Sequence, residues 1–134
     1  KPIQAYTFDD VLISPRYSEV RSRTNVDLST KLGNIDLELP IVSSNMKTIT
    51  GSKMAATIAM SGGLGILHRF CTIEENAKMY DDAMNLLVYP DNPERESIWA
   101  ENIGVSLGVK KEDKDRLKEL AFNWVGYEEN DEEE

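Results

Sequence analysis

Polar side chains follow two short apolar runs within residues 41–70, "IVSSNMKTITGSKMAATIAMSGGLGILHRF". The first run leads into Ser43, Ser44, Asn45 and Met46, and the second into His68 and Arg69. Hydroxyl, amide, imidazole and guanidinium groups can hydrogen-bond to a substrate, and an arginine can hold an anionic group. If both runs are strands of a parallel sheet, these side chains lie at its carboxyl edge, where ligands bind in parallel α/β folds.

Each of these residues also has a simpler interpretation. His68 is the only histidine, and a single histidine is more often structural than catalytic. Arg69 could form an ion pair with a neighbouring loop. Cys71 is the only cysteine, and a nucleophilic cysteine needs a base or a lowered pKa. Because no second histidine could serve as that base, we interpret Cys71 as an inert small residue and assign no catalytic residue. The sequence contains no metal-ligand cluster of histidines or cysteines.

The elements that must position these residues alternate between strand and helix. Residues 34–40 alternate apolar and polar side chains, which predicts a strand with one solvent-facing side. Buried strands are predicted over 40–46 and 64–70 and a third strand over 102–109. This order of strands and helices favours an α/β fold with a parallel sheet.

Three helices complete the pattern. The first is predicted to start at Ser52 as N-cap, to bury one face and to end at Gly62-Gly63; the residues of that face are Met54, Ala55, Ile58 and Ala59. The second follows a capping box at Thr72–Glu75. The third covers residues 111–124, with Leu117, Leu120, Ala121 and Trp124 on one stripe, and residues 88–97 are predicted to be a loop. "SGGLG" resembles a phosphate-binding glycine loop, but it follows a helix and precedes a strand, which is the reverse of a dinucleotide fingerprint.

Composition limits the function classes. The chain has 134 residues and a net charge of −9, and six of its acidic residues lie in "EENDEEE" at the carboxyl end. We expect one domain over residues 1–125 and an acidic, disordered tail over 126–134. No basic stripe indicates nucleic-acid binding, no apolar run reaches the roughly 18 residues of a membrane helix, and no apolar signal-peptide core is present. A single cysteine fits a reducing compartment, so a cytoplasmic protein is expected.

Four segments together resemble a known family. "YTFDDVLISPRYSEVRSRTNVDLSTKL", "LPIVSSNMKTIT", "MAATIAMSGGLGILHRFCTIEE" and "IGVSLGVKKED" resemble, in order and spacing, the amino-terminal part of the IMP dehydrogenase and GMP reductase family. The resemblance covers residues 6–120. It implies a partial TIM-type (β/α) barrel, with about three β/α units preceded by an extended segment with a short β element. It also implies an oligomeric enzyme of purine metabolism that uses NAD or NADPH.

The resemblance also implies roles for individual residues. Family members use a cysteine nucleophile that attacks the purine ring of IMP or GMP. Carried over, Ser43, Ser44, Asn45 and Met46 bind the nucleotide substrate, and His68 and Arg69 lie on the cofactor side. The family usually has an aspartate where this sequence has Lys47, so the contact made by that aspartate is in doubt. Residues 88–102 are too few for the regulatory insert of IMP dehydrogenases, which favours a GMP reductase-like layout.

Parts of the family pattern have no match here. A complete barrel takes roughly 200 to 250 residues, and the segment with the catalytic cysteine and the phosphate-binding glycine loops are absent from this sequence. Cys71 does not replace that cysteine, because it directly follows the second buried strand. We therefore expect the chain alone to be inactive and to need a partner, either a second polypeptide with the rest of the barrel or another copy of itself. The alternatives are a non-catalytic remnant that binds a nucleotide or a related subunit, and an unstable fragment.

Overall fold

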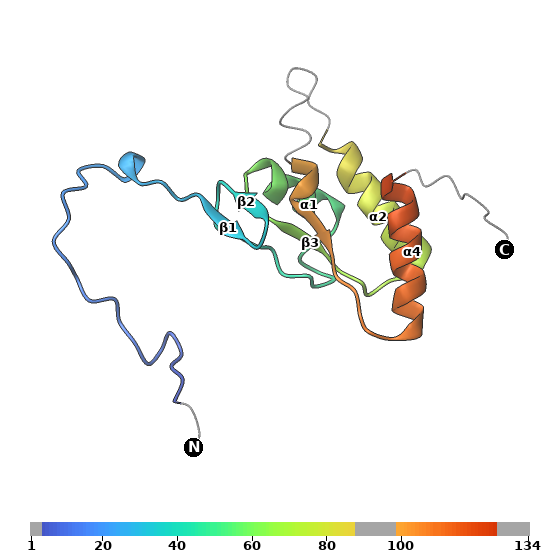
Figure 1. Cartoon of the computed structure of the whole chain (residues 1–134), viewed down its shortest axis with the longest axis horizontal. Helices are drawn as coiled ribbons and strands as arrows, with labels where there is room; N and C mark the ends of the chain where they lie inside the picture. The colour runs from blue at the N-terminus through green and yellow to red at the C-terminus, as the bar shows by residue number, and fades with distance from the viewer. Residues whose placement is uncertain (1–3, 88–98, 126–134) are drawn as a thin grey trace.

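The computed structural model describes residues 4–87 and 99–125, with side chains up to residue 121 (Figure 1). The predicted loop over 88–97, the acidic tail over 126–134 and the Trp124 side chain lie outside this described part. Residues 4–29 run as an extended segment away from the folded body, apart from one turn of 3-10 helix, η1 (Arg23–Asn25). Apolar side chains in this segment are largely exposed, including Phe8 and Leu12, each 98% exposed.

An antiparallel hairpin connects the extended segment to the body. Strands β1 (Thr30–Leu32) and β2 (Ile35–Leu37) pair with Leu32 opposite Ile35, so the turn has two residues. Gly33 in this turn has a φ of 61°, a conformation that glycine adopts without steric cost. The predicted strand over 34–40 is therefore present but shorter, and only Leu37 on it is fully buried. The sequence did not predict its partner β1.

Two parallel strands form the second sheet. Strand β3 (Gly65–Leu67) pairs with β4 (Ile103–Val105), with Gly65 opposite Ile103. Both strands lie inside the predicted ranges 64–70 and 102–109 and are shorter than predicted. The parallel pairing of strands joined through a helix confirms the α/β fold expected from the alternation of elements.

The predicted strand over residues 40–46 is wrong in extent. Only one bridge forms, between Val42 and Leu64, in the parallel direction. Leu64 N–H donates to the Ile41 carbonyl and Ser43 N–H donates to the Leu64 carbonyl, each at 2.9 Å. The next bond of the ladder is made by a side chain, because the Ile66 N–H donates to Ser43 Oγ at 3.1 Å. The segment thus leaves the sheet one residue after the bridge.

Helix α1 (Ser52–Met60) covers one face of β3. Its N-cap is Gly51, which has extended backbone angles, and not Ser52 as predicted, because Ser52 is already helical. The buried residues are Ala55, Ala56 and Ala59, whereas the predicted core residue Met54 is 43% exposed. The helix ends as predicted before Gly62, whose φ is 82°. Small residues allow α1 to lie directly on the strand, since a Cβ at Gly65 would meet backbone atoms of Ala55.

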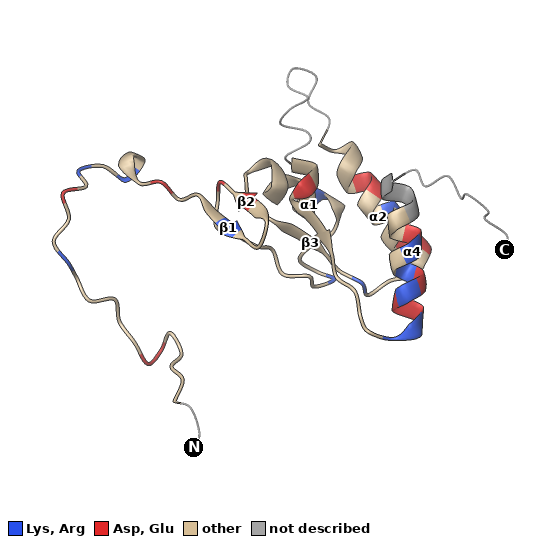
Figure 2. Ribbon diagram, in the orientation of Figure 1, with Lys and Arg blue, Asp and Glu red and all other residues tan. Residues whose placement is uncertain are grey.

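Helices α2 (Ile73–Asn85) and α4 (Lys111–Val125) pack side by side, and α2 also contacts α1 (Figure 1). The predicted capping box is confirmed: Thr72 Oγ1 accepts from Glu75 N–H at 3.1 Å, and Glu75 Oε2 accepts from Thr72 N–H at 2.9 Å. On α4, Leu120 is buried as predicted, but Leu117 is 53% exposed. Charged residues of both signs alternate along α4 (Figure 2).

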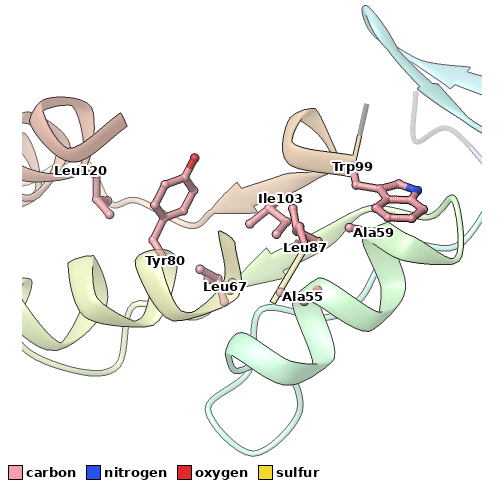
Figure 3. Close-up of a cluster of buried hydrophobic side chains, with 10 residues drawn as sticks. Ala55, Ala59, Leu67, Tyr80, Leu87, Trp99, Ile103 and Leu120 are labelled. Carbon is pink, nitrogen blue, oxygen red and sulfur yellow. The ribbon is translucent and has the colours of Figure 1, made fainter. Parts of the chain in front are cut away.

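The hydrophobic core lies between this helix layer and the β3–β4 sheet (Figure 3). Leu67, Ile103 and Leu87 lie at its centre, with Trp99 at one end and Tyr80 and Leu120 at the other. Burial raises the pKa of the Tyr80 hydroxyl. On the opposite face of the sheet, Ile66 and Gly104 lie side by side and are only partly buried. Within the described ranges, no helix is long and apolar enough to cross a membrane.

Candidate functional site at the carboxyl edge of the sheet

The Ser43 hydroxyl links the first predicted site segment to β3. Ser43 is half-buried, and its Oγ accepts the Ile66 N–H at 3.1 Å. This bond explains why a serine suits the position, because the hydroxyl takes the place of a backbone carbonyl. Ser43 therefore has a structural role in the sheet, which the sequence did not predict, and its side chain bonds the middle residue of β3, one residue before that strand ends.

The residues that follow Ser43 form a compact turn over 44–50. The Ser44 carbonyl accepts from Met46 N–H at 2.8 Å and from the Thr50 hydroxyl. Thr50 is fully buried, so it anchors the turn from inside. The predicted substrate-binding side chains Ser44, Asn45 and Met46 are all exposed. The turn thus holds its backbone by internal bonds and presents these side chains at the edge of the sheet.

His68 is buried at the end of β3 and is 5% exposed. Its Nδ1 accepts the Phe70 N–H at 3.2 Å, which places the proton of the neutral ring on Nε2. Its carbonyl accepts from Asn76 Nδ2 at 3.1 Å. Burial lowers the pKa of His68, and the positive charge of Lys47 lowers it further. The ring is therefore predominantly neutral at pH 7.

Lys47 is the position at which the sequence departs from the family pattern. It is exposed in the turn over 44–50, and its charge acts on the imidazole of His68. The charge of Lys47 in the turn thus acts on a side chain at the end of β3. An aspartate here would act on the pKa of His68 in the opposite direction, because a nearby anion favours the protonated imidazole.

Arg69 points to helix α4. Its Nη1 donates to Asp113 Oδ1 at 3.4 Å, and its side chain remains 43% exposed, whereas Asp113 is 6% exposed. Asp113 Oδ2 accepts the Lys110 N–H at 3.1 Å. Burial raises the pKa of Asp113, but hydrogen bonds from the backbone of Gly108 and Lys110 and the charges of Arg69 and Arg116 outweigh it, so the net pKa is lowered. The sequence predicted, as the simpler role of Arg69, an ion pair with a neighbouring loop. The ion pair is present, but its partner Asp113 lies in the first turn of helix α4 and not in a loop.

A second arginine, Arg116 on helix α4, binds the segment that follows β3 and the start of α2. It donates through Nη1 to the Thr72 carbonyl at 3.2 Å and to Asn76 Oδ1 at 2.9 Å, and through Nη2 to the Cys71 carbonyl at 2.9 Å. Its Nε is buried and has no hydrogen-bond partner within the described residues. Sequence reasoning missed Arg116 and Asn76, because their contacts join residues about forty positions apart.

Two further residues complete the edge. Ser106 follows β4, and both its N–H and its hydroxyl donate to the Leu67 carbonyl at 3.0 Å. The sequence signal for Ser106 was its position as a polar residue directly after the apolar run "IGV". Cys71 is half-buried beside the capping box and its carbonyl is bound by Arg116. Among the residues that the structure covers, no group of acidic, histidine and cysteine side chains could hold a metal ion.

Arg69 is the residue at this edge whose side chain could hold an anionic group. Arg69 is a partly exposed cation, and its bond to Asp113 is made through Nη1. His68, in contrast, has its Nδ1 and its carbonyl engaged by the protein. The described residues therefore fit an anionic group near Arg69.

An apolar cavity of about 320 Å³ lies away from this edge, between β4, α2 and α4. It is lined mainly by Ile103, Val105, Leu117, Leu120 and Tyr80. It contains none of the predicted site residues, so the cavity and the polar edge are separate features.

Comparisons with known proteins identify the family of this chain. The model of the IMP dehydrogenase / GMP reductase domain matches residues 5–126. An inosine-5'-monophosphate dehydrogenase from Nitrosopumilus maritimus is 53% identical over 75 residues, which is 55% of this chain and 16% of the relative. A GMP reductase from Leishmania donovani is 54% identical over 77 residues, or 57% of this chain and 16% of the relative. The matched part thus spans about a sixth of the length of these relatives.

Solved structures give the same result. An inosine 5' monophosphate dehydrogenase from Legionella pneumophila superposes with a TM-score of 0.69 at 36% identity, covering 90% of this chain and 33% of that one. A GMP reductase from Trypanosoma brucei in complex with guanosine 5'-triphosphate gives a TM-score of 0.53 at 52% identity, covering 55% and 18%. The two relatives named above, one from each branch of the family, match at 53% and 54% identity, so these matches do not separate the branches. The domain match over nearly the whole chain, together with the α/β fold, shows that this protein belongs to the IMP dehydrogenase / GMP reductase family.

Proposed function

We propose that the carboxyl edge of the β3–β4 sheet forms part of the nucleotide pocket of a purine-nucleotide oxidoreductase. The observation that carries the proposal is the convergence at this edge of the polar strand ends in a chain of this family. Ser44, Asn45 and Met46 are exposed there on a turn whose backbone is internally bonded. Their side chains can therefore contact IMP or GMP without first breaking bonds of the turn.

The cofactor is proposed to be NAD or NADPH, with its phosphates near Arg69. When bound, the nicotinamide ring accepts or supplies the hydride of the reaction. His68 lies next to Arg69 and is neutral, so it adds a hydrogen-bonding group and no charge. Arg69 carries the positive potential that attracts phosphate groups.

The pocket is proposed to be completed by further barrel elements, supplied by a second polypeptide or by a homo-oligomer. The incompletely covered face formed by Ile66 and Gly104, which are only partly buried, supports this proposal, because parallel sheets are normally covered on both faces. In the completed (β/α) barrel, this face would point to the interior. The cysteine nucleophile would come from the added elements, since Cys71 lies just after the end of β3, beside the capping box of α2.

Complementation tests the proposal. The chain is mixed with a carboxyl-terminal barrel segment of a family member that holds the catalytic cysteine. We expect NAD-linked oxidation of IMP or NADPH-linked reduction of GMP from the mixture and from neither component alone. The short span between α2 and β4 favours the second reaction. Nucleotide binding without turnover would support a non-catalytic binding role instead, and absence of both would contradict the proposal.

Two variants locate the pocket in the complemented protein. Ser44→Ala should weaken nucleotide binding by about 1 kcal/mol, the typical net contribution of one hydrogen bond. Arg69→Ala should weaken cofactor binding more at low salt than at high salt. The controls are Ser14→Ala in the extended segment and Lys118→Ala on the exposed side of α4. Parent-like binding by both Ser44→Ala and Arg69→Ala would show that the edge residues do not contact the ligands.

A further inference from the structure

We infer that helix α4 positions the His68–Arg69 pair at the carboxyl edge through two of its own side chains, Arg116 and Asp113. The functional consequence rests on the proposed function, because it concerns cofactor binding at this pair. The positioning itself rests on contacts within the described residues. Neither Arg116 nor Asp113 is proposed to touch substrate or cofactor, so both are positioning residues.

Arg116 binds the turn that follows β3. Its guanidinium donates to three oxygens: the carbonyls of Cys71 and Thr72 and the side-chain oxygen of Asn76, at 2.9, 3.2 and 2.9 Å. Two of these oxygens belong to the backbone directly after Arg69 and Phe70. Because the guanidinium is planar and rigid, three simultaneous bonds restrict where that backbone can lie.

Asn76 extends this contact to His68. Its side chain is fully buried, accepts from Arg116 Nη1 through Oδ1, and donates from Nδ2 to the His68 carbonyl at 3.1 Å. A buried amide that is satisfied at both ends has a defined orientation, and losing either partner would leave a polar atom without one. Arg116 thus acts on His68 through Asn76.

Asp113 holds the other member of the pair. Its Oδ1 accepts from Arg69 Nη1 at 3.4 Å, while Oδ2 accepts the Lys110 N–H at 3.1 Å. Space around this carboxylate is tight, since a Cβ at Gly108 would lie 2.3 Å from Asp113 Oδ2 and 2.6 Å from Arg69 Nη1. The Arg69 guanidinium is therefore held beside Asp113 by both charge and packing.

The two contacts come from one face of one helix. Asp113 and Arg116 are three residues apart on α4, so they lie on the same side of the helix, one turn apart. A shift of α4 would move both contacts together. The position of α4 is consequently coupled to the backbone of His68 and to the side chain of Arg69.

The single histidine provides a direct readout. His68 is the only histidine in the chain, so its ring nitrogen and carbon NMR signals are assigned without ambiguity. In Arg116→Met we expect the His68 titration midpoint to rise by about 0.5 pH unit or more, because a loosened turn exposes the ring to water. The Phe70 amide signal should move as well, since its N–H donates to His68 Nδ1.

Matched variants separate positioning from a general loss of charge or stability. Lys118→Met removes one positive charge from the exposed side of the same helix and should leave both signals unchanged. Asn76→Ala keeps every charge but removes the side chain that connects Arg116 to the His68 carbonyl. It should therefore reproduce the signal changes of Arg116→Met. The double variant should add little to either single change. Arg116→Lys keeps the charge but not the planar fork, and should restore the signals only in part.

Unchanged His68 and Phe70 signals in folded Arg116→Met and Asn76→Ala would overturn the inference. Circular dichroism establishes which variants fold. If Arg116→Met and Asn76→Ala do not fold, Arg116→Lys decides: parent-like signals contradict positioning, and shifted signals support it. Asp113→Asn should shift the side-chain Nε signal of Arg69. An unchanged signal would contradict the inference that Asp113 positions Arg69.

The effect on function is measured in the complemented protein with NADPH or NAD as the probe. Arg116→Met should weaken cofactor binding about fivefold, equivalent to roughly 1 kcal/mol, whereas Lys118→Met should not. Shifted NMR signals with unchanged cofactor affinity would retain the positioning but contradict the cofactor-side role of the pair. Unchanged NMR signals with a normal cofactor response would contradict the positioning and retain the proposed function.

Discussion

The close approach of α1 to β3 makes Gly65 a position where one added methyl group should be costly. A Cβ at Gly65 would lie 2.5 Å from the Ala55 carbonyl oxygen and 2.6 Å from Ala55 Cα. Both are backbone atoms of α1, so relief requires the helix to move away from the strand. Overpacking costs about 1–3 kcal/mol, and a backbone obstacle places Gly65→Ala near the upper end of that range.

Gly104 on the neighbouring strand is the matched control. A Cβ there would lie 3.8 Å from Ile66 Cγ1, an ordinary contact. Gly104→Ala should therefore be neutral or should stabilise by up to about 1 kcal/mol, because alanine has fewer unfolded conformations than glycine. The two variants differ by one identical methyl group on adjacent parallel strands, so their comparison isolates the contact with α1.

Urea unfolding followed by circular dichroism measures the difference. A gap of about 3 kcal/mol corresponds to roughly 1–3 M urea between the midpoints of the two variants, given slopes of about 1–3 kcal/mol/M. If Gly65→Ala does not fold and Gly104→Ala does, the order of stability of the two variants is also as expected. Equal midpoints, or a less stable Gly104→Ala, would refute the close contact between α1 and β3.

Four further predictions follow from single contacts. Ser43→Ala should lower the free energy of unfolding by about 1–2 kcal/mol and speed exchange of the Ile66 amide, and Ser43→Thr, which keeps the hydroxyl, should not. Thr72→Ala should cost about 1 kcal/mol through loss of the cap, measured by thermal melting; a melting temperature equal to that of Thr72→Ser would contradict it. The pKa of His68 is lowered in the folded state from 6.5, so its contribution to the free energy of unfolding is present above pH 6.5 and is lost as the pH falls below 6.5. His68→Gln should therefore reduce the change of the urea midpoint with pH. An unchanged pH dependence would exclude His68 as its source. Lys47→Asp should raise the titration midpoint of His68 in NMR, and an unchanged midpoint would mean that the two groups lie too far apart.

Local features of the fold were predictable from the sequence. The capping box at Thr72–Glu75 involves residues three apart and depends little on the rest of the chain, and the glycine stop after α1 is equally local. The N-cap of α1 was misplaced by one residue, because Gly51 and Ser52 are both acceptable caps and only the backbone angles distinguish them. Met54 was expected in the core, but the face of α1 on the strand requires small residues, and the alanines occupy it.

Long-range contacts account for most of what sequence reasoning missed. The polar strand ends were predicted as a group, but the bond from Ile66 to Ser43 joins residues 23 apart and has no sequence signature. The same holds for Arg116 and Asn76, which are 40 residues apart. For Arg69 the ion pair was foreseen as an alternative, whereas its partner Asp113, 44 residues away, could be identified only after the chain had folded.

The Ser43 hydroxyl connects the turn over 44–50 to the sheet through a rotatable bond. A backbone carbonyl is fixed by its peptide plane, whereas Oγ can leave the Ile66 N–H by rotation about χ1 of Ser43 alone. Loss of this bond leaves the backbone bonds between Ile41, Ser43 and Leu64 intact. Rotation of one side chain can therefore free the Ile66 N–H and the Ser43 hydroxyl for other partners without unpairing of the strands.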